Sequence, residues 1–338
     1  MYNEGSNSMT HAGRLRPSGP HVVTLILALV PVLLLVGVVA TIAFKALPAV
    51  TDVGLPTLFS TKFSNRFSGT WTKGEYGLIP SLWGTLLITS VAMALAFPVS
   101  LAMGIFITES PWAWPARVLE TIVALFAGIP PVLYGFMALL VAKAFMQPNF
   151  TGLGLSEDAI KALPGLPPWN PRILPRENSV LLGGMLLALL IIPFIAPLIL
   201  DALRNVQQNL VEGSLALGAN RWLTLRRIIL PLAMPGIISS VTLGMLKAIG
   251  DVMVVAFAVG MLAERPPVPL WDPFEATTSL TGAAAGLLGG MLDGGITSAP
   301  KLDSAVAFFA GLMLLVLAFA ILGLASFLQR LVLRRVSP

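Results

Sequence analysis

Six apolar stretches, each about as long as a lipid bilayer is thick, constrain the fold of this chain more than any other feature. They cover residues 22–46, 78–108, 115–146, 179–203, 231–263 and 304–328. A helix needs roughly 20 apolar residues to cross the hydrocarbon core, where its backbone groups must be hydrogen-bonded internally. Only 11% of the residues are charged, against about 25% in soluble domains. The sequence predicts an all-α integral membrane protein with six transmembrane helices.

The composition argues against several classes of chemistry. The chain has no cysteine, and both histidines, His11 and His21, precede the first apolar stretch. A thiolate or histidine metal site inside the fold is therefore excluded, and no catalytic residues are expected. The sequence contains no glycine-rich phosphate loop of the G-x-x-x-x-G-K-[ST] type. We therefore expect no cofactor on this chain, and if ATP and Mg²⁺ drive it, a partner subunit binds them.

Arginines at the helix ends predict the orientation in the membrane. Alternation places 1–21, 109–114, 204–230 and 329–338 on one side, and 47–77, 147–178 and 264–303 on the other. Near the helix ends, the first side carries six arginines, at positions 221, 226, 227, 330, 334 and 335. The positive-inside rule then places this side and both termini in the cytoplasm. We read 1–21 and 331–338 as cytoplasmic tails, and 22–75 as a retained first transmembrane helix with an outer loop.

Several of the stretches exceed a straight span and contain helix breakers. Pro98 interrupts the second, Gly128-Ile129-Pro130-Pro131 the third, and Pro193 and Pro197 the fourth. Proline removes a backbone donor, so breaks suit positions where helices pack together or line a polar cavity. A kink that serves packing alone is an equal alternative. The weakly apolar residues 276–292 are expected to form an outer loop with some helix, or a short re-entrant helix.

The loop at 204–230 is the most distinctive segment outside the spans. It contains Glu212-Gly213-Ser214 and Gly218-Ala219-Asn220-Arg221, and it ends at Ile228-Ile229-Leu230-Pro231. Leucines and Trp222 give it apolar faces, and Gly218 permits a tight turn. Pro231 is able to open the next helix. This pattern predicts a helix–turn–helix at the membrane surface, whose apolar side is buried against its own membrane domain or a cytosolic partner.

The spacing in this loop resembles the EAA loop of ABC importer permeases, in which a glycine follows the glutamate by six residues and I-x-L-P comes later. Glu212, Gly218, Ile228, Leu230 and Pro231 match that pattern, and Gly213 and Ser214 replace the two alanines. The resemblance implies that 204–230 is a coupling loop that docks on an ATP-binding subunit, through Glu212, Gly213, Ser214, Gly218, Ala219, Arg221 and Pro231. A chance amphipathic loop is the alternative.

Residues 76–330 resemble the phosphate permeases of the PstC type within that superfamily. The resemblance covers Tyr76-Gly77-Leu78-Ile79-Pro80, Gly84-Thr85-Leu86 and Gly128-Ile129-Pro130-Pro131-Val132-Leu133-Tyr134-Gly135. It implies a MetI-like core, location in the inner membrane and import of phosphate. The implied partners are a second permease subunit of the PstA type, two ATP-binding subunits of the PstB type and an extracytoplasmic binding protein of the PstS type.

Two charged residues lie in the fifth apolar stretch. Leu246-Lys247-Ala248-Ile249-Gly250-Asp251 resembles G-R-A-L-G-E of the PstC type, whose Arg and Glu are implicated in phosphate passage. An intramembrane charge costs roughly 2.5–3.5 kcal/mol and indicates a transport pathway. An i,i+4 salt bridge within one helix is the structural alternative. Lysine lacks the planar fork of arginine, so sulfate, molybdate or a phosphonate remains open as the substrate.

Hydroxyl side chains supplement this candidate pathway. Thr85 and Thr89 share one face of the second stretch, and Ser239 and Ser240 precede Lys247. Each is able to donate to a passing anion or to its own helix backbone. Two other classes of function remain as alternatives: an ATP-independent secondary transporter or channel, and a membrane anchor without a pathway.

Overall fold

The structure is a computed structural model that describes residues 19–61, 76–137, 179–259, 277–292 and 300–336. Residues 1–18 of the predicted tail 1–21 lie outside these described residues. So do residues 62–75, 138–178, 260–276, 293–299 and 337–338, which hold parts of the predicted spans, of the outer segments and of the second tail. The chain divides into two units, one ending at Phe44 and one beginning at Lys45. The first unit contains most of α1 (Gly19–Pro48), and every site discussed below belongs to the second unit.

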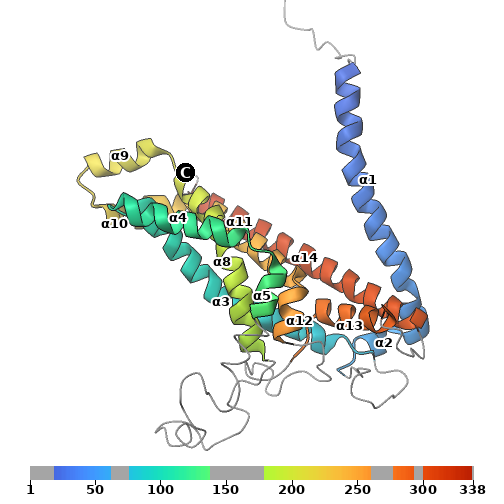
Figure 1. The fold of residues 1–338 in the computed structure, drawn as a ribbon. Helices are drawn as coiled ribbons and strands as arrows, with labels where there is room; N and C mark the ends of the chain where they lie inside the picture. Colours follow the sequence, from blue (N-terminus) through green and yellow to red (C-terminus); the bar gives the residue numbers. More distant parts are fainter. Residues whose placement is uncertain (1–18, 62–75, 138–178, 260–276, 293–299, 337–338) are drawn as a thin grey trace, which may run out of the picture. The chain divides into compact units, whose positions relative to one another are not determined.

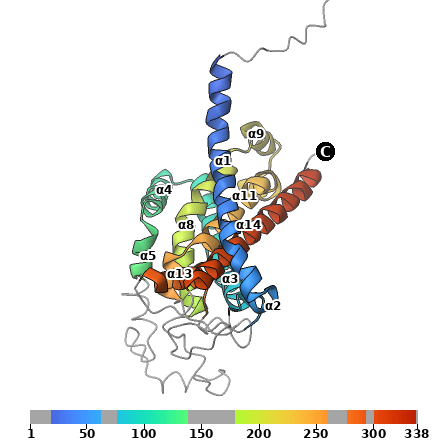
Figure 2. The same ribbon diagram turned by 90° about the vertical axis from the view of Figure 1, so that its right-hand side faces the viewer.

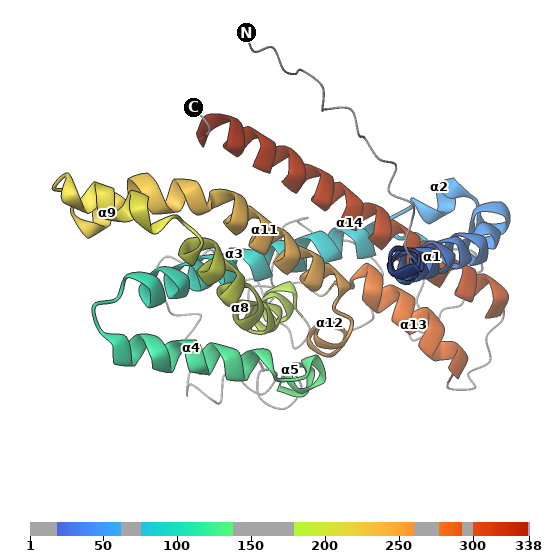
Figure 3. The same ribbon diagram turned by 90° about the horizontal axis from the view of Figure 1, so that it is seen from above.

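Four long helices form the centre of the second unit. They are α3 (Ile79–Glu109), α8 (Val180–Arg204), α11 (Leu230–Gly250) and α14 (Pro300–Val336) (Figure 1). The pair α4 (Ala113–Ala127) and α5 (Pro131–Met137) lies on one side of α8, and α14 lies on the other (Figures 2 and 3). Short elements complete the unit: η1 (Ala49–Val53), α2 (Leu55–Leu58), α9 (Gln208–Ala216), α10 (Arg221–Thr224), η4 (Leu225–Ile229), α12 (Met253–Ala258) and α13 (Leu280–Leu292).

The helices confirm the predicted membrane class. Five helical stretches of the described chain are long and apolar enough to cross a bilayer, and α4 with α5 makes a sixth if the bent pair is one span. The observed bounds Ile79–Glu109 and Val180–Arg204 follow the predicted second and fourth stretches closely. The 13 residues of α13 are fewer than the roughly 20 that a span requires. The stretch 276–292 is therefore helical from Leu280 without crossing the membrane by itself.

The third span breaks where its prolines predicted. The axes of α4 and α5 differ by 93° across the intervening residues. Pro130 and Pro131 cannot donate to the carbonyls one turn earlier, so the helix cannot continue. The Tyr134 hydroxyl donates to Phe126 O at 3.0 Å, and this bond ties α5 back to the end of α4. Because Tyr134 is only 2% exposed, the bend is a packed structural feature.

The fifth span differs from the prediction of 231–263 at both ends. It begins at Arg221 and ends at Gly250, because α10, η4 and α11 follow one another without a loop. Pro231 therefore lies inside this continuous helical stretch and does not begin it. The turn before it is a π-helix at Leu225–Ile229, and the wider turn accommodates a residue that cannot donate to the fourth residue before it. After Gly250 the chain becomes extended at Asp251 and then forms α12.

The core lies where α3 and α8 cross. Ile88 and Ala92 of α3 pack against Leu187, Ile191 and Ile195 of α8, all at most 1% exposed. Gly184 allows the close approach of α3, since an added Cβ would collide with Val91, and Gly183 allows the approach of Val259 after α12 in the same way. Small residues serve this purpose in membrane proteins, where lipid tails give no hydrophobic driving force between helices.

At each end of the second unit lie segments that the predicted alternation assigned to the same side of the membrane. Thr108 and Glu109 of α3, Arg204 of α8 and Gln208 of α9 line one common cavity, and α14 ends at the same end as α9 (Figures 1 and 3). At the opposite end Leu58, Leu78, Leu280 and Val306 form a second core cluster, beside a 3.0 Å hydrogen bond from Tyr76 to Asp303. The predicted alternation of the described segments is therefore present.

The close helix contact at Gly184 gives a stability prediction. Gly184→Ala places a methyl group against Cβ and Cγ1 of Val91, and overpacking of this kind costs about 1–3 kcal/mol. We expect a lower thermal unfolding temperature of the purified protein in detergent. Gly311→Ala on α14 is the control, because nothing lies within 4 Å of the added methyl group. Equal melting of the two variants would contradict the proposed tight packing.

Candidate functional site

The segment predicted as a coupling loop is a helix–turn–helix. Helix α9 ends at Ala216, and Gly218 adopts a left-handed conformation with φ of 87°. Ala219 N–H donates to Ser214 O at 3.2 Å, and Gly218 N–H donates to Leu215 O at 3.0 Å. This pair of bonds is the Schellman arrangement, which satisfies the last carbonyls of a helix and favours glycine at the left-handed position. The expected tight turn at Gly218 is confirmed.

Side chains fix the two sides of this turn to each other. Asn220 accepts a hydrogen bond from Leu223 N–H at 2.7 Å, which caps the start of α10. The Ser214 hydroxyl lies 3.0 Å from the Thr224 hydroxyl and joins α9 to α10. The residue that replaces an alanine of the EAA pattern therefore makes a contact that alanine lacks. The loop is an ordered extension of the fifth span.

Large apolar side chains remain exposed on this extension. Leu217 is 91% exposed and Trp222 is 65% exposed, and Leu210 and Leu215 are also largely uncovered. Glu212 and Arg221 are exposed beside them. Clustered apolar residues within a polar rim are typical of a protein contact. The arrangement suits docking of a partner on α9 and α10.

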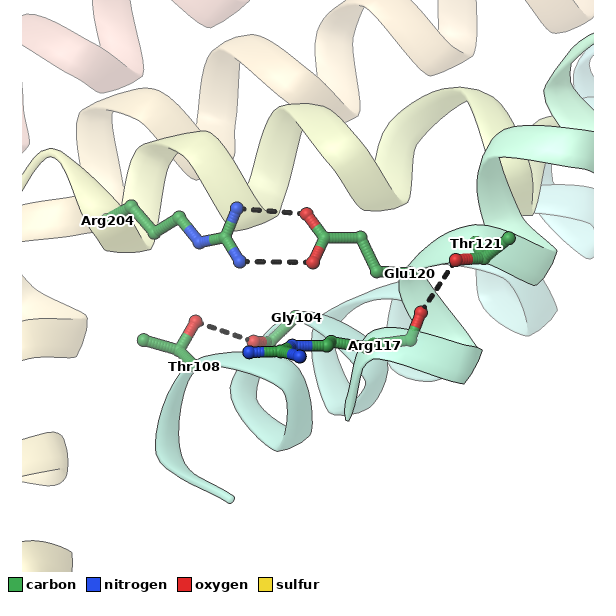
Figure 4. A network of polar contacts seen from close by, with 6 residues as sticks. All are labelled: Gly104, Thr108, Arg117, Glu120, Thr121 and Arg204. Atoms are coloured by element: carbon green, nitrogen blue, oxygen red, sulfur yellow. Dashed lines mark hydrogen bonds and ion pairs between the residues drawn. The ribbon is translucent and has the colours of Figure 1, made fainter. Parts of the chain in front are cut away.

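A cavity of about 420 Å³ lies beside the base of α9. Its lining comes from the ends of α3 and α8, the start of α9, and Ile229 of η4. Next to it Arg204 makes two hydrogen bonds to Glu120, at 3.0 and 3.3 Å, and so joins the end of α8 to α4 (Figure 4). Thr108 donates to Gly104 O and Thr121 to Arg117 O, within their own helices (Figure 4). The bidentate pair fixes the geometry from which α9 projects.

Lys247 lies near the end of α11 and is partly buried. Its ammonium nitrogen is 4.3 Å from the centre of the Phe194 ring on α8. In the described part of the chain it forms no ion pair with Asp251, so the salt-bridge alternative is not realised in this conformation. A cation held over an aromatic face is stabilised without being neutralised. Among the described residues, the contact that the structure shows for the Lys247 ammonium group is the one with the Phe194 ring.

Asp251 occupies a different position from the one expected. The prediction placed it on the same helix as Lys247, but α11 ends at Gly250 and Asp251 is extended. Its Oδ1 accepts Val254 N–H at 2.8 Å, so the carboxylate caps α12. Asp favours this position because it satisfies the free N–H groups of the first turn. Asp251 is thus a helix-capping residue at a break in the fifth span.

The hydroxyls assigned to the pathway mostly bond to backbone. Ser240 donates to Gly236 O at 2.9 Å, and Ser239 donates to Pro235 O at 3.0 Å. Gln329 of α14 also donates to Ser239, at 2.7 Å. Thr89 is buried on α3, one turn beyond Thr85. The structure therefore shows the backbone-bonded alternative for both serines in this conformation.

Thr85 belongs to a hydroxyl cluster that sequence reasoning did not assemble. We define this cluster as Ser81, Thr85, Thr277, Ser279 and Thr281, all at most 7% exposed. Thr85 accepts Leu280 N–H at 2.8 Å, Ser279 accepts Gly282 N–H at 2.9 Å, and Thr281 donates to Asp251 O at 3.3 Å. The cluster joins α3 and the start of α13 to the break after Lys247. The run Thr277-Thr278-Ser279 before a Gly-rich helix is the signal in the sequence that could have revealed it.

Two members of the cluster lack hydrogen-bond partners. Ser81 Oγ and Thr277 Oγ1 are buried and pair with nothing among the described residues. A buried unpaired hydroxyl costs about 1–3 kcal/mol. No group of three or more His, Asp or Glu side chains gathers in the described part of the chain to hold a metal. Among the described residues, the polar side chains toward the end of α11 include Lys247, the capping Asp251 and the hydroxyls of the cluster.

Fold and site together define a multi-pass helical membrane protein with an ordered loop that exposes apolar side chains. Residues 96–337 match the family described as "Binding-protein-dependent transport system inner membrane component". The chain belongs to this family of ABC importer permeases. Membership implies a location in the inner membrane, a separate ATP-hydrolysing partner and a substrate-binding protein. The chain is thus a transport subunit and not an enzyme.

Several characterised proteins are similar to the chain. A probable ABC transporter permease, YqgH of Bacillus subtilis, is 30% identical over 75% of this chain and 72% of its own length. A phosphate transport system permease, PstC of Xylella fastidiosa, is 30% identical over 80% of this chain and 78% of its own. PstC 1 of Mycobacterium tuberculosis is 28% identical over 97% of both chains.

A solved structure gives the same fold. The inward-facing methionine transporter MetNI matches with a TM-score of 0.50 and 18% identity, covering 75% of this chain and 95% of the matched chain. This likeness supports the MetI-like core that the resemblance of residues 76–330 implied.

The cap of α10 gives a prediction for the loop. Asn220→Ala removes the acceptor for Leu223 N–H and weakens the cap by about 0.5–2 kcal/mol. We expect faster hydrogen exchange at Leu223 and its neighbours in α10. Asn209→Ala on the exposed surface of α9 is the control and leaves α10 exchange unchanged. Unchanged exchange in Asn220→Ala would show that the turn does not depend on this cap.

Proposed function

We propose that the chain is one of two permease subunits of an ATP-driven importer of inorganic phosphate. The carrying observation is Lys247, a cation without a salt bridge among the described residues, on the helical stretch that continues into the candidate coupling loop. Relatives named as PstC phosphate permeases support phosphate as the anion. A lysine inside a membrane span raises the free energy of insertion, by up to roughly 2.5–3.5 kcal/mol at the helix centre, and a pathway for anions would account for its presence.

Lys247 acts as the attractive site on the path of the anion. The Phe194 face stabilises the ammonium group when no anion is near, and a phosphate oxygen offers a stronger charge-assisted partner when it passes. A single mobile cation binds more weakly than a bidentate arginine, which favours release. The subunit breaks no bond in this role, because it presents the site to one side of the membrane at a time.

ATP acts on this chain through the partner subunits that bind it. An ATP-binding subunit docks on the exposed apolar residues of α9 and α10, with Glu212, Gly213, Ser214, Gly218, Ala219, Arg221 and Pro231 in or beside the contact. Binding of ATP favours one conformation of the permease pair, so the transport cycle is a shift between two populations. The remaining partners are a PstA-type permease, two PstB-type subunits and a PstS-type binding protein, and both termini face the cytoplasm with the coupling loop.

Another oxyanion is the second candidate. Lys247 stands where arginine is found in the PstC pattern, and a point charge discriminates less by shape than a planar fork does. Sulfate, molybdate or a phosphonate would use the same lysine. Competition by these anions against phosphate uptake distinguishes the candidates. Family membership argues against an ATP-independent transporter or a simple anchor.

Removal of the cation tests the pathway. Lys247→Gln retains length and hydrogen-bonding capacity but loses the charge, so we expect phosphate uptake by the reconstituted complex to fall to background while the complex still assembles. Lys247→Arg restores the charge and is expected to retain uptake. Lys45→Gln is the matched control, because Lys45 also lies over a phenylalanine, at 4.9 Å from the Phe308 ring. Normal uptake in Lys247→Gln would refute the role.

Distortion of the turn tests the coupling loop. Gly218→Pro cannot adopt the observed φ of 87°, since proline is fixed near −65°. We expect loss of the ATP-binding subunit on co-purification, or loss of stimulated ATPase activity. Gly218→Asn is the control, because asparagine tolerates the left-handed region. If Gly218→Pro retained both the subunit and the stimulation, the docking assignment would be wrong.

A further inference from the structure

The junction between α3 and the start of α13 contains buried hydroxyls that the fold does not use. Ser81 and Thr277 are both 0% exposed, and their hydroxyl oxygens have no partner among the described residues. The neighbouring hydroxyls of Thr85 and Ser279 are engaged with backbone N–H groups. Most buried polar groups in proteins are hydrogen-bonded, so two exceptions at one junction require an explanation.

Capping of α13 does not explain the unpaired hydroxyls of Ser81 and Thr277. Leu280 N–H is bonded to Thr85, and Gly282 N–H is bonded to the Ser279 side chain. Ala283 N–H donates to Ser279 O at 2.8 Å. The first turn of α13 is therefore already satisfied without Ser81 or Thr277.

The close packing at Gly84 places Thr277 directly on α3. A Cβ at Gly84 would collide with Thr278 O and would lie 2.5 Å from Thr277 Oγ1. Glycine at 84 thus lets residues 277 and 278 lie directly on α3, one turn after Ser81 in the same helix. A larger residue would separate the segments. Gly84 thus keeps α3 in close contact with residues 277 and 278, while the hydroxyls of Ser81 and Thr277 remain unpaired.

The junction is connected to the proposed pathway. The Thr281 hydroxyl donates to Asp251 O at 3.3 Å, and its oxygen lies 2.7 Å from the hydroxyl oxygen of Ser279. Asp251 follows the end of α11, one turn beyond Lys247. The cluster lies at the end of the second unit opposite to α9 (Figure 3). The hydroxyl cluster is therefore hydrogen-bonded to the segment of chain that directly follows the helix of Lys247.

We propose that Ser81 and Thr277 form an oxyanion subsite on the outer approach to Lys247, an inference that rests on the proposed function. The ligand is a tetrahedral oxyanion that has lost part of its hydration, and the two hydroxyls replace lost water by donating to its oxygens. They carry no charge, so they hold the anion weakly and pass it on to the lysine. In the present conformation the junction is closed, and the subsite fills when residues 277–281 separate from α3.

Removal of both hydroxyls tests the subsite, because it is expected to lower transport without lowering the stability of the protein. The double variant Ser81→Ala, Thr277→Val deletes two unpaired buried groups, so its unfolding temperature is expected to stay equal or rise. Uptake of radiolabelled phosphate by the full complex, reconstituted with its binding protein and ATP, is expected to fall about tenfold. Stimulation of ATPase activity by the binding protein is expected to persist, which separates a path defect from lost coupling.

Two sets of variants serve as controls. Ser100→Ala removes a fully buried hydroxyl from the same helix, where it donates to Ile192 O at 3.4 Å, and Thr108→Val removes one that bonds within α3. Both are expected to transport at the wild-type rate. Ser81→Thr with Thr277→Ser keeps both hydroxyls and is expected to retain most uptake. If the double variant failed to assemble, the single variants would carry the same comparison.

The outcomes separate the subsite from the proposed function. Wild-type uptake of phosphate together with undiminished uptake in the double variant overturns the subsite and leaves the function intact. Absence of phosphate uptake in the wild type, with uptake of sulfate or molybdate, overturns phosphate as substrate, and the same variants are then compared with that anion. Uptake of no oxyanion by the wild type overturns both.

Discussion

Every backbone group inside a bilayer must find a partner within the protein, and the breaks in this fold satisfy that requirement with side chains. Tyr134 donates to Phe126 O across the bend between α4 and α5. Asp251 accepts Val254 N–H where α11 gives way to α12. Thr85 accepts Leu280 N–H where α13 begins. Polar residues in the apolar stretches therefore have structural roles first, and any transport role is added to that requirement.

Local sequence patterns predicted the features that depend on local chemistry. Apolar length located the spans, the proline pair located the 93° bend, and glycine at 218 located the turn with positive φ. The break after Gly250 was not predicted, because the apolar composition continues through α12 and no proline marks the end of α11. Gly250 followed by Asp251, with an apolar run that begins at Val252, is the capping pattern that could have indicated this break.

The candidate site was predictable only in part, because its contacts join distant segments. Lys247 was identified from its charge and from the resemblance of its segment to the PstC pattern, but its Phe194 neighbour lies on another helix. Thr85 was chosen for its place on a helix face; it donates to Ser81 O in its own helix and also accepts from Leu280 N–H, 195 residues away. The unpaired state of Ser81 and Thr277 follows from tertiary packing at Gly84 and has no local signature. Residue type identified candidate site residues, and the packed structure was needed to show which contacts they make.

The continuous helix from Arg221 to Gly250 gives the proposed coupling a mechanical basis. Its 30 residues span roughly 45 Å, and no loop between α10 and α11 can absorb a displacement. The Schellman turn and the contact between Ser214 and Thr224 transmit movement of α9 to α10. At the far end the chain is broken at Asp251, beside the hydroxyl cluster. In the proposed coupling, movement of the loop is passed along this helical stretch to Lys247, and the stretch ends at Asp251, where the cluster joins α11 to α13 and α3.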